Sequence, residues 1–137
     1  DAAREAAADY RAAADNDIQS TVIAGRVELQ AGDRDRARKL FQSVIDRDPG
    51  NISANGGLAL IASAESKLDE ARDRFNAVLD AHPEDAPTLM NLAALEEQEG
   101  NTLAMVAALE KAVVADQAAL RPRLALARYR INTGQFR

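Results

Sequence analysis

The sequence contains no cysteine and no tryptophan, and aromatic residues make up only 4% of its 137 positions. Without cysteine the chain has no disulfide, thiol nucleophile or thiolate metal site, and its compartment stays open because oxidising and reducing environments both tolerate such a chain. No apolar run approaches the roughly 18 residues of a membrane span, and the first residues carry no basic stretch followed by an apolar one. We therefore expect no transmembrane segment or signal peptide in this chain.

Groups for catalysis or metal binding are also scarce. The single histidine, His82, precedes Pro83, so a serine-histidine-aspartate triad or a zinc site of several histidines cannot form within the chain. We expect His82 to be exposed or to cap a helix end. The acidic cluster Glu96, Glu97 and Glu99 lacks the spacing of a calcium-binding loop, so we expect it to form a solvated face. The sequence contains no glycine-rich phosphate-binding loop. The sequence predicts no enzyme, no metal and no cofactor.

Alanine and charge are what the sequence has in quantity. Thirty of the residues are alanine, which favours helix but buries little area, so we expect closely packed helices rather than a sheet. The net charge of −5 disfavours a nucleic-acid partner. Residues 117–137 contain five arginines and no acid. This basic end is either a local bias that neighbouring sequence balances or a site for an anion or an acidic partner.

Equivalent residues recur every 34 positions. The step joins prolines, alanines, phenylalanines, turn residues and small residues alike, so it is far more specific than any single motif. The matching sets are Pro49 and Pro83; Ala37 and Ala71; Phe41 and Phe75; Gly32, Ser66, Gly100 and Gly134; Gly25, Ala59, Ala93 and Ala127; and Leu58, Leu92 and Leu126.

Each period predicts two helices. Apolar residues between Val22 and Leu29 mark a first helix, and those from Ala37 to Ile45 follow helical spacing in a second. Gly32 can end the first helix in a left-handed conformation while Asp33 caps the second, and we expect Gly100 and Asn101 to act in the same way. Pro49 and Pro83 are expected to stop the second helices, since proline lacks an N–H donor.

A 34-residue helix pair with small residues at the crossing, then alanine, phenylalanine and a final proline, resembles the tetratricopeptide repeat. The resemblance divides the chain into repeats at 18–51, 52–85 and 86–119, a partial repeat at 120–137, and the second helix of a preceding repeat at 1–17. The third repeat departs from the pattern, with Met105 for alanine, Leu109 for phenylalanine and Gln117 for proline. We expect the whole chain, 1–137, to be one array cut from a longer protein.

The resemblance implies an all-α fold, a right-handed solenoid of antiparallel helix pairs, whose first helices line a concave groove. It implies a non-catalytic scaffold that binds a peptide or protein segment there, unless the partner uses the convex face or the edges. The implied groove residues are Gln19, Val22, Arg26, Leu29, Gln30, Ser53, Gly56, Leu60, Ser63, Ala64, Met90, Ala94, Glu97, Gln98, Arg121, Leu124, Arg128 and Asn132.

Two details narrow the binding mode. Family members that hold a chaperone's terminal carboxylate use lysine, asparagine and arginine at positions occupied here by Val22, Arg26, Gly57, Pro87 and Asn91, so this clamp is absent. Gly56 and Gly57 are adjacent inside an expected first helix, and each lowers the stability of that helix by about 0.5–1 kcal/mol relative to alanine. We expect close packing at Gly57, whereas Gly56 serves either packing or groove space.

Two broader expectations remain. The stretch 110–135 resembles repeats of bacterial lipoproteins linked to exosortase and exopolysaccharide systems, which implies a scaffold for polymer export or protein sorting, in the periplasm or anchored at the outer membrane. The alternative is self-association through apolar faces at the two ends of the array. The residues expected to be exposed on those faces are Ala3, Ala7, Tyr10, Leu126 and Phe136.

Overall fold

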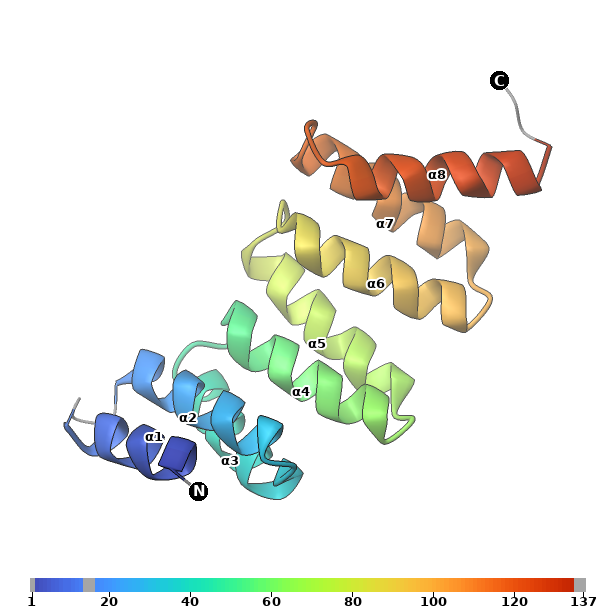
Figure 1. Ribbon diagram of the computed structural model, residues 1–137. Coiled ribbons are helices and arrows are strands. Elements are labelled where there is room, and N and C mark those ends of the chain that lie inside the picture. The colour runs from blue at the N-terminus through green and yellow to red at the C-terminus, as the bar shows by residue number, and fades with distance from the viewer. Residues whose placement is uncertain (1, 14–16, 135–137) are drawn as a thin grey trace. The chain divides into compact units, whose positions relative to one another are not determined.

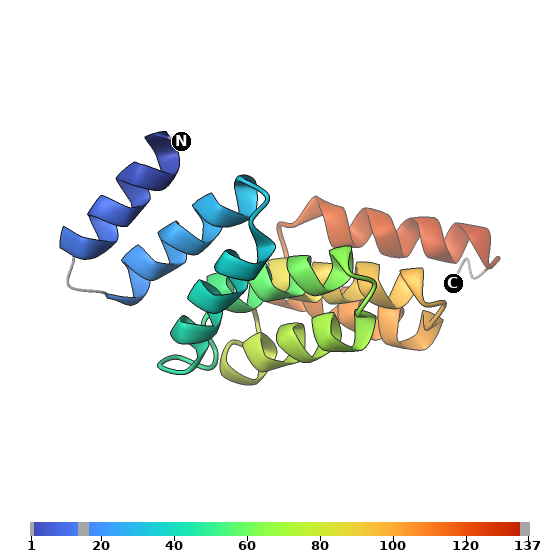
Figure 2. The ribbon, with the colours of Figure 1, turned by 90° about the horizontal axis from the view of Figure 1, so that it is seen from below.

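The computed structural model describes residues 2–13 and 17–134, with backbone alone for residues 10–13. These residues form eight helices and no strand, in two compact units, Asp1–Ala81 and His82–Arg137. Within each unit the helices are arranged in antiparallel pairs (Figures 1 and 2), which confirms the all-α class of helix pairs. The helices are α1 (Ala2–Ala13), α2 (Ile18–Gln30), α3 (Arg34–Ile45), α4 (Ile52–Ala64), α5 (Leu68–Ala81), α6 (Ala86–Gln98), α7 (Thr102–Ala115) and α8 (Leu120–Asn132).

The helices keep the 34-residue step that the sequence predicts. The first helices α2, α4, α6 and α8 begin 34 residues apart, and so do the second helices α3, α5 and α7. All four turn residues of the predicted set have a positive φ: 86° at Gly32, 76° at Gly100, 69° at Gly134 and 60° at Ser66. Glycine adopts this left-handed conformation freely, whereas Ser66 adopts it against its own preference.

The helix caps follow the prediction in one pair and not in another. Asp33 caps α3, its Oδ1 accepting a hydrogen bond from the Arg36 N–H at 3.0 Å. The expected cap at Asn101 is wrong, because its side chain donates instead to Glu96 Oε2 at 2.7 Å. Glu96 is buried, at 5% exposure, and does not belong to the solvated face expected for this acidic cluster.

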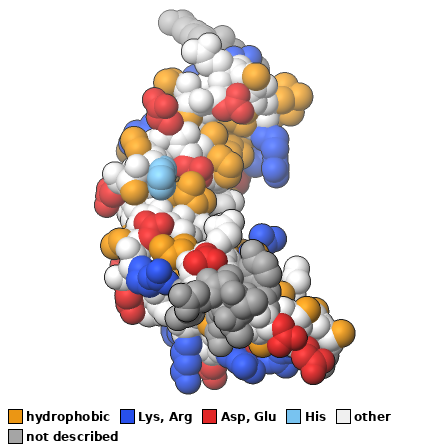
Figure 3. All heavy atoms as spheres, turned by 90° about the vertical axis from the view of Figure 1, so that its left-hand side faces the viewer, with side chains coloured by type: hydrophobic (Ala, Val, Ile, Leu, Met, Phe, Trp, Pro, Cys, Tyr) orange, Lys and Arg blue, Asp and Glu red, His pale blue; other side chains and the backbone are white. Residues whose placement is uncertain are grey.

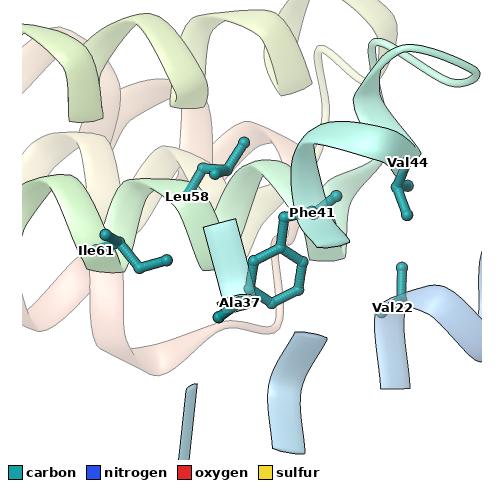
Figure 4. Close-up of a cluster of buried hydrophobic side chains, with 7 residues drawn as sticks. Val22, Ala37, Phe41, Val44, Leu58 and Ile61 are labelled. Carbon is teal, nitrogen blue, oxygen red and sulfur yellow. The ribbon is translucent and has the colours of Figure 1, made fainter. Parts of the chain in front are cut away.

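The core of the N-terminal unit is built around Phe41, which is fully buried on α3. Figure 4 shows its ring among side chains from α2 and α4. A Cβ atom added at Gly57 would lie 2.3 Å from the ring, and one added at Gly25 would lie 2.7 Å from it. The two glycines thus let two first helices close on one aromatic ring. This confirms that Gly57 serves packing.

Charged side chains attach α1 to the rest of the unit. Arg4 donates from Nε to Glu28 Oε2 at 2.7 Å and from Nη2 to Asp33 Oδ2 at 3.0 Å. Hydrogen bonding to Glu28 is the main cause that raises the pKa of Arg4 above its ordinary value. Glu28 is buried, at 6% exposure, and a second guanidinium, that of Arg36, lies 3.4 Å from its Oε1.

The apolar faces expected to be exposed at the ends of the array differ from the prediction. Ala7 and Leu126 are both buried, at 7% exposure, because α1 packs on α2 and α8 packs on α7. Ala3 is exposed, as expected for this face. The Tyr10 side chain and Phe136 lie outside the described residues. The observed surfaces therefore give little support to the expected contacts between array ends.

The C-terminal unit has the same plan with smaller side chains. Leu109 and Met105 of α7 are buried together with Ala93 of α6 and Leu126 of α8. Leu109 of α7 takes the position that Phe41 holds in α3. In this unit a leucine and the side chains around it fill the space that the aromatic ring fills in the N-terminal unit. The unit thus reaches a closed core although its sequence departs from the repeat pattern.

The glycine pair in α4 yields a matched test of packing. Gly57→Ala is expected to lower the free energy of unfolding by about 1–3 kcal/mol, because the new methyl group overlaps the buried Phe41 ring. Gly56→Ala is expected to raise it by about 0.5–1 kcal/mol, since its Cβ meets nothing within 4 Å and alanine favours helix. Urea unfolding of both variants measures the difference. Equal stabilities would show that Phe41 does not need Gly57.

Glu65 gives the unit a pH dependence. Its carboxylate lies 2.7 Å from Lys67 Nζ and 2.6 Å from Arg38 Nη2, and hydrogen bonds to Lys67 and then Arg38 lower its pKa below the ordinary 4.5. A carboxylate whose pKa is lowered by folding stabilises the protein above its unfolded pKa, and this contribution disappears as the pH falls through the folded pKa.

Glu65→Gln is therefore expected to be less stable than the original chain at pH 7, with a difference that shrinks as the pH falls below about 4. Urea midpoints measured between pH 7 and pH 3 give this difference. Asp73→Asn is the control, since Asp73 is exposed on α5 and has no ion pair among the described residues. A constant difference between Glu65→Gln and the original chain across this range would contradict the assignment.

Candidate functional site

A hollow lies on the N-terminal unit between α2 and α4. It has a volume of about 320 Å³, near the lower end of the roughly 300–1,000 Å³ of ligand sites. Phe41 and Gly57 form its floor. Its other lining residues are Arg26, Leu29 and Gln30 of α2 and Ser53, Gly56 and Leu60 of α4. All six of these were predicted from the sequence, so the structure brings them together at one place.

The chemistry of this hollow suits a side chain with apolar and polar parts. Leu60 is 65% exposed and provides the main apolar wall. Arg26 is exposed at the rim and forms no ion pair among the described residues. A Cβ added at Gly56 would meet no atom within 4 Å, so this glycine leaves open space. The structure thus favours groove space at Gly56, in contrast to the close packing at Gly57.

Two further hollows lie on the C-terminal unit between α6 and α8. The two share Met90 and Ala94 of α6. One is bordered by Glu97, Arg128, Tyr129 and Asn132, and the other, of about 490 Å³, by Pro87, Asn91, Leu120 and Arg121. Of the residues predicted for this unit, Met90, Ala94, Glu97, Arg121, Arg128 and Asn132 line these hollows.

Charge in the C-terminal hollows is unevenly paired. Arg128 Nη2 lies 3.1 Å from Glu97 Oε1, and both side chains are more than half exposed. An exposed pair of this kind contributes about 0–1 kcal/mol and can open for a ligand. Arg121 has no ion pair among the described residues. The hollows therefore combine an apolar floor with two guanidinium groups. That of Arg121 is unpaired among the described residues, and that of Arg128 is held by an ion pair that a ligand could replace.

Several predicted residues lie elsewhere. Val22 is a correction: it is 5% exposed and belongs to the Phe41 core, because the α2 helix turns this side chain inward, so it cannot anchor a partner. Gln19, Ser63, Ala64, Gln98 and Leu124 are exposed but do not line these hollows.

The sequence reasoning missed lining residues that come from second helices and turns. Phe41, Met105 and Leu109 lie on second helices and form the buried layer beneath the hollows, which open between neighbouring first helices. Their one signal in the sequence was the 34-residue step, which relates Phe41 to Leu109 but does not show that a hollow lies above either side chain. Tyr129 and Leu120 were missed because the direction in which they point depends on the rotation of α8.

The described residues were searched for groups that could hold a metal ion and for helices that could cross a membrane. In the part of the chain that the structure describes, no group of three or more histidine, cysteine, aspartate or glutamate side chains could hold a metal ion. His82 is exposed, as expected. None of the helices in that part is long and apolar enough to span a membrane.

Comparisons with known proteins agree with this architecture. Two family models described as tetratricopeptide repeat match residues 28–95 and 1–52. A search of curated protein sequences finds no match.

Solved structures are similar over most of the chain. A crystal structure of MamA matches with a TM-score of 0.78 at 14% identity, covering 96% of this chain and 77% of MamA. MamA from Desulfovibrio magneticus RS-1, from residue 41 to its end, matches with a TM-score of 0.74 at 19% identity, covering 96% of this chain and 74% of that MamA chain. YrrB, described as a TPR protein with an unusual peptide-binding site, matches with a TM-score of 0.68 at 19% identity, covering 81% of this chain and 57% of YrrB. At these identities the likeness concerns the fold.

Proposed function

The chain belongs to the tetratricopeptide repeat family of all-α solenoids, and we propose that it is a non-catalytic scaffold whose first helices bind a segment of another protein. The observation that carries this proposal is the hollow between α2 and α4, where six residues predicted from the sequence converge. An exposed leucine, an unpaired arginine and a bare glycine backbone lie side by side there. This combination fits an extended peptide, which offers both apolar side chains and main-chain hydrogen-bonding groups.

The peptide-binding site of YrrB supports the proposal by likeness of fold. In the present chain, Leu60 supplies an apolar anchor, while Arg26 and Gln30 supply polar contacts that fix the position of the peptide along the hollow. Apolar contacts near the centre of a binding surface contribute most of the affinity, and polar groups at its rim contribute specificity. The net charge of −5 favours a protein over a nucleic acid as the partner.

The cellular setting that we propose is a scaffold at the bacterial cell envelope, in exopolysaccharide export or protein sorting. Its support is the resemblance of residues 110–135 to lipoprotein repeats. Fractionation of cells that express the parent protein tests this setting separately from peptide binding.

Gly56→Leu tests the binding site directly. Peptides selected from a displayed random library on the original chain are expected to bind this variant at least about tenfold more weakly, because the leucine fills open space in the hollow. Fluorescence anisotropy with the labelled peptides gives the dissociation constants, and circular dichroism checks that the helix content is kept.

Asn76→Leu is the matched control, because it places the same side chain at an exposed position of α5 outside the hollow. The control is expected to bind the selected peptides with unchanged affinity. Equal binding by Gly56→Leu and the original chain would place the peptide site on another face.

A further inference from the structure

The two hollows between α6 and α8 follow one another along these helices, which run in the same direction (Figures 1 and 2). One hollow lies where both helices start, beside Arg121, and the other lies toward their ends, beside Arg128. Met90 and Ala94 border both, so the hollows join into one surface, the α6–α8 channel. Figure 3 shows hydrophobic side chains in orange next to lysine and arginine side chains in blue on the C-terminal unit. The channel thus has an apolar middle between two guanidinium groups.

All the helices that enclose the channel belong to the described chain. Its walls are α6 and α8, and Met105 and Leu109 of α7 lie beneath it. The equivalent hollow between α2 and α4 stays open although α5, the second helix that follows α4, packs against α4. A helix that followed α8 in the same arrangement would therefore leave the α6–α8 channel open too.

The channel differs from the N-terminal hollow by two arginines. Two steps of 34 residues relate Ser53 to Arg121 and Leu60 to Arg128. All four side chains line their hollows. The main apolar wall of the N-terminal hollow is thus replaced by a guanidinium group, which prefers a carboxylate partner. The two surfaces therefore select different side chains.

Both guanidinium groups are accessible to a ligand. Arg121 is exposed and has no ion pair among the described residues. Arg128 pairs with Glu97 at 3.1 Å, but both side chains are more than half exposed, so a carboxylate from a ligand can take the place of Glu97. The other acid at the channel, Asp116, accepts hydrogen bonds at 3.0 and 3.1 Å from two backbone N–H groups of the turn before α8. Each arginine can therefore bind one carboxylate of a partner.

The start of α8 supports a carboxylate at the Arg121 end of the channel. The cap residues of the preceding first helices, Asp17, Asn51 and Asp85, accept hydrogen bonds from N–H groups in the first turns of these helices. The same 34-residue step places Ala119 before α8, and its side chain has no acceptor. Ala119 also lines the channel. The first turn of α8 therefore lacks the acceptor that the other first helices have, and a helix N-terminus favours a negative charge.

The spacing of the two arginines indicates how the carboxylates are arranged. Arg121 and Arg128 are seven residues apart, so they lie on the same side of α8, about 10.5 Å apart along its axis. An extended segment in the polyproline II conformation has three residues per turn and rises about 3.1 Å per residue. Two acidic residues that are three positions apart in such a segment point the same way, about 9 Å apart. This distance matches that between the arginines.

We propose that the α6–α8 channel binds an extended acidic segment of a partner protein, with two carboxylates three residues apart held by Arg121 and Arg128. The first carboxylate lies at the start of α8, and the second displaces Glu97. An apolar residue between them packs on Met90 and Ala94. This inference rests on the proposed function, because it names the partner chemistry for one part of the surface formed by the first helices.

Short fluorescent peptides test the recognition of acids by the full 137-residue chain. The matching probe carries glutamate at its third and sixth positions, leucine between them and proline elsewhere in the segment. A second probe has glutamine in place of both glutamates, and a third has the same composition as the matching probe with the glutamates adjacent. Fluorescence anisotropy is expected to show that the matching probe binds about tenfold more tightly than the glutamine probe and about threefold more tightly than the third.

Substitutions in the channel make the test specific. Arg121→Gln and Arg128→Gln are each expected to weaken binding of the matching probe about tenfold. Arg123→Gln is the matched control, since it removes the same charge from the same helix but lines the groove between α7 and α8, and it is expected to leave the affinity unchanged. Glu97→Gln is expected to strengthen binding about threefold, because it removes the carboxylate that competes for Arg128. Circular dichroism confirms that the variants are folded.

The proposal is overturned if the matching and glutamine probes bind alike, if neither binds, or if Arg123→Gln acts as strongly as Arg121→Gln, which would indicate unspecific charge attraction. Weaker binding by Glu97→Gln would also overturn it, because Glu97 would then belong to the binding site instead of competing with the ligand.

The library-selected peptides distinguish this failure from failure of the proposed function. If they bind the chain and Gly56→Leu weakens them while the matching probe does not bind, the proposed function stands and the acidic specificity is wrong. If Gly56→Leu abolishes binding of the matching probe while Arg121→Gln and Arg128→Gln keep it, the acidic segment binds between α2 and α4, and the assignment to the α6–α8 channel is overturned.

Discussion

The N-terminal unit depends on the close approach of two helices to the ring of Phe41. Gly25 and Gly57 lie on different first helices, and any side chain at either position would overlap the ring. The ring therefore sets how near α2 and α4 can come. Because the hollow between these helices has the same ring as its floor, the contact that closes the core also fixes the width of the candidate binding site. Folding and binding share one constraint here.

Adjacent residues of α4 divide these two tasks. Successive residues of a helix point about 100° apart, so Gly57 can face the ring while Gly56 faces the hollow. Both positions lack a side chain, but their surroundings differ: the Phe41 ring leaves no space for one at Gly57, whereas open space lies beside Gly56. A helix that carries two costly glycines in its interior is thus explained by one structural requirement and one proposed functional requirement.

Ion pairs supplement a core that is rich in alanine. Alanine buries little apolar area, so contacts between helix pairs leave part of the stabilisation to charged groups. Arg4 attaches α1 to α2 through the buried Glu28, and Arg38 joins α3 to Glu65 at the end of α4. Removal of Arg4 would leave the buried Glu28 with the more distant Arg36 as its partner, whereas each exposed pair contributes little. In the C-terminal unit, Arg130 stands at the position that Glu28 holds in α2, and its guanidinium lies 3.9 Å from Glu110 of α7.

The sequence by itself determined the helix pairs, their 34-residue step and six of the eight residues that line the hollow between α2 and α4, because periodic apolar positions and turn residues are local properties of the chain. It also indicated that Gly57 serves packing. Only the tertiary structure decided that Val22 and Glu96 are buried, that Gly56 is open and that Asn101 bonds to Glu96 rather than capping a helix. These outcomes depend on how each helix is rotated against its neighbours, and that rotation is set by contacts between residues far apart in the sequence.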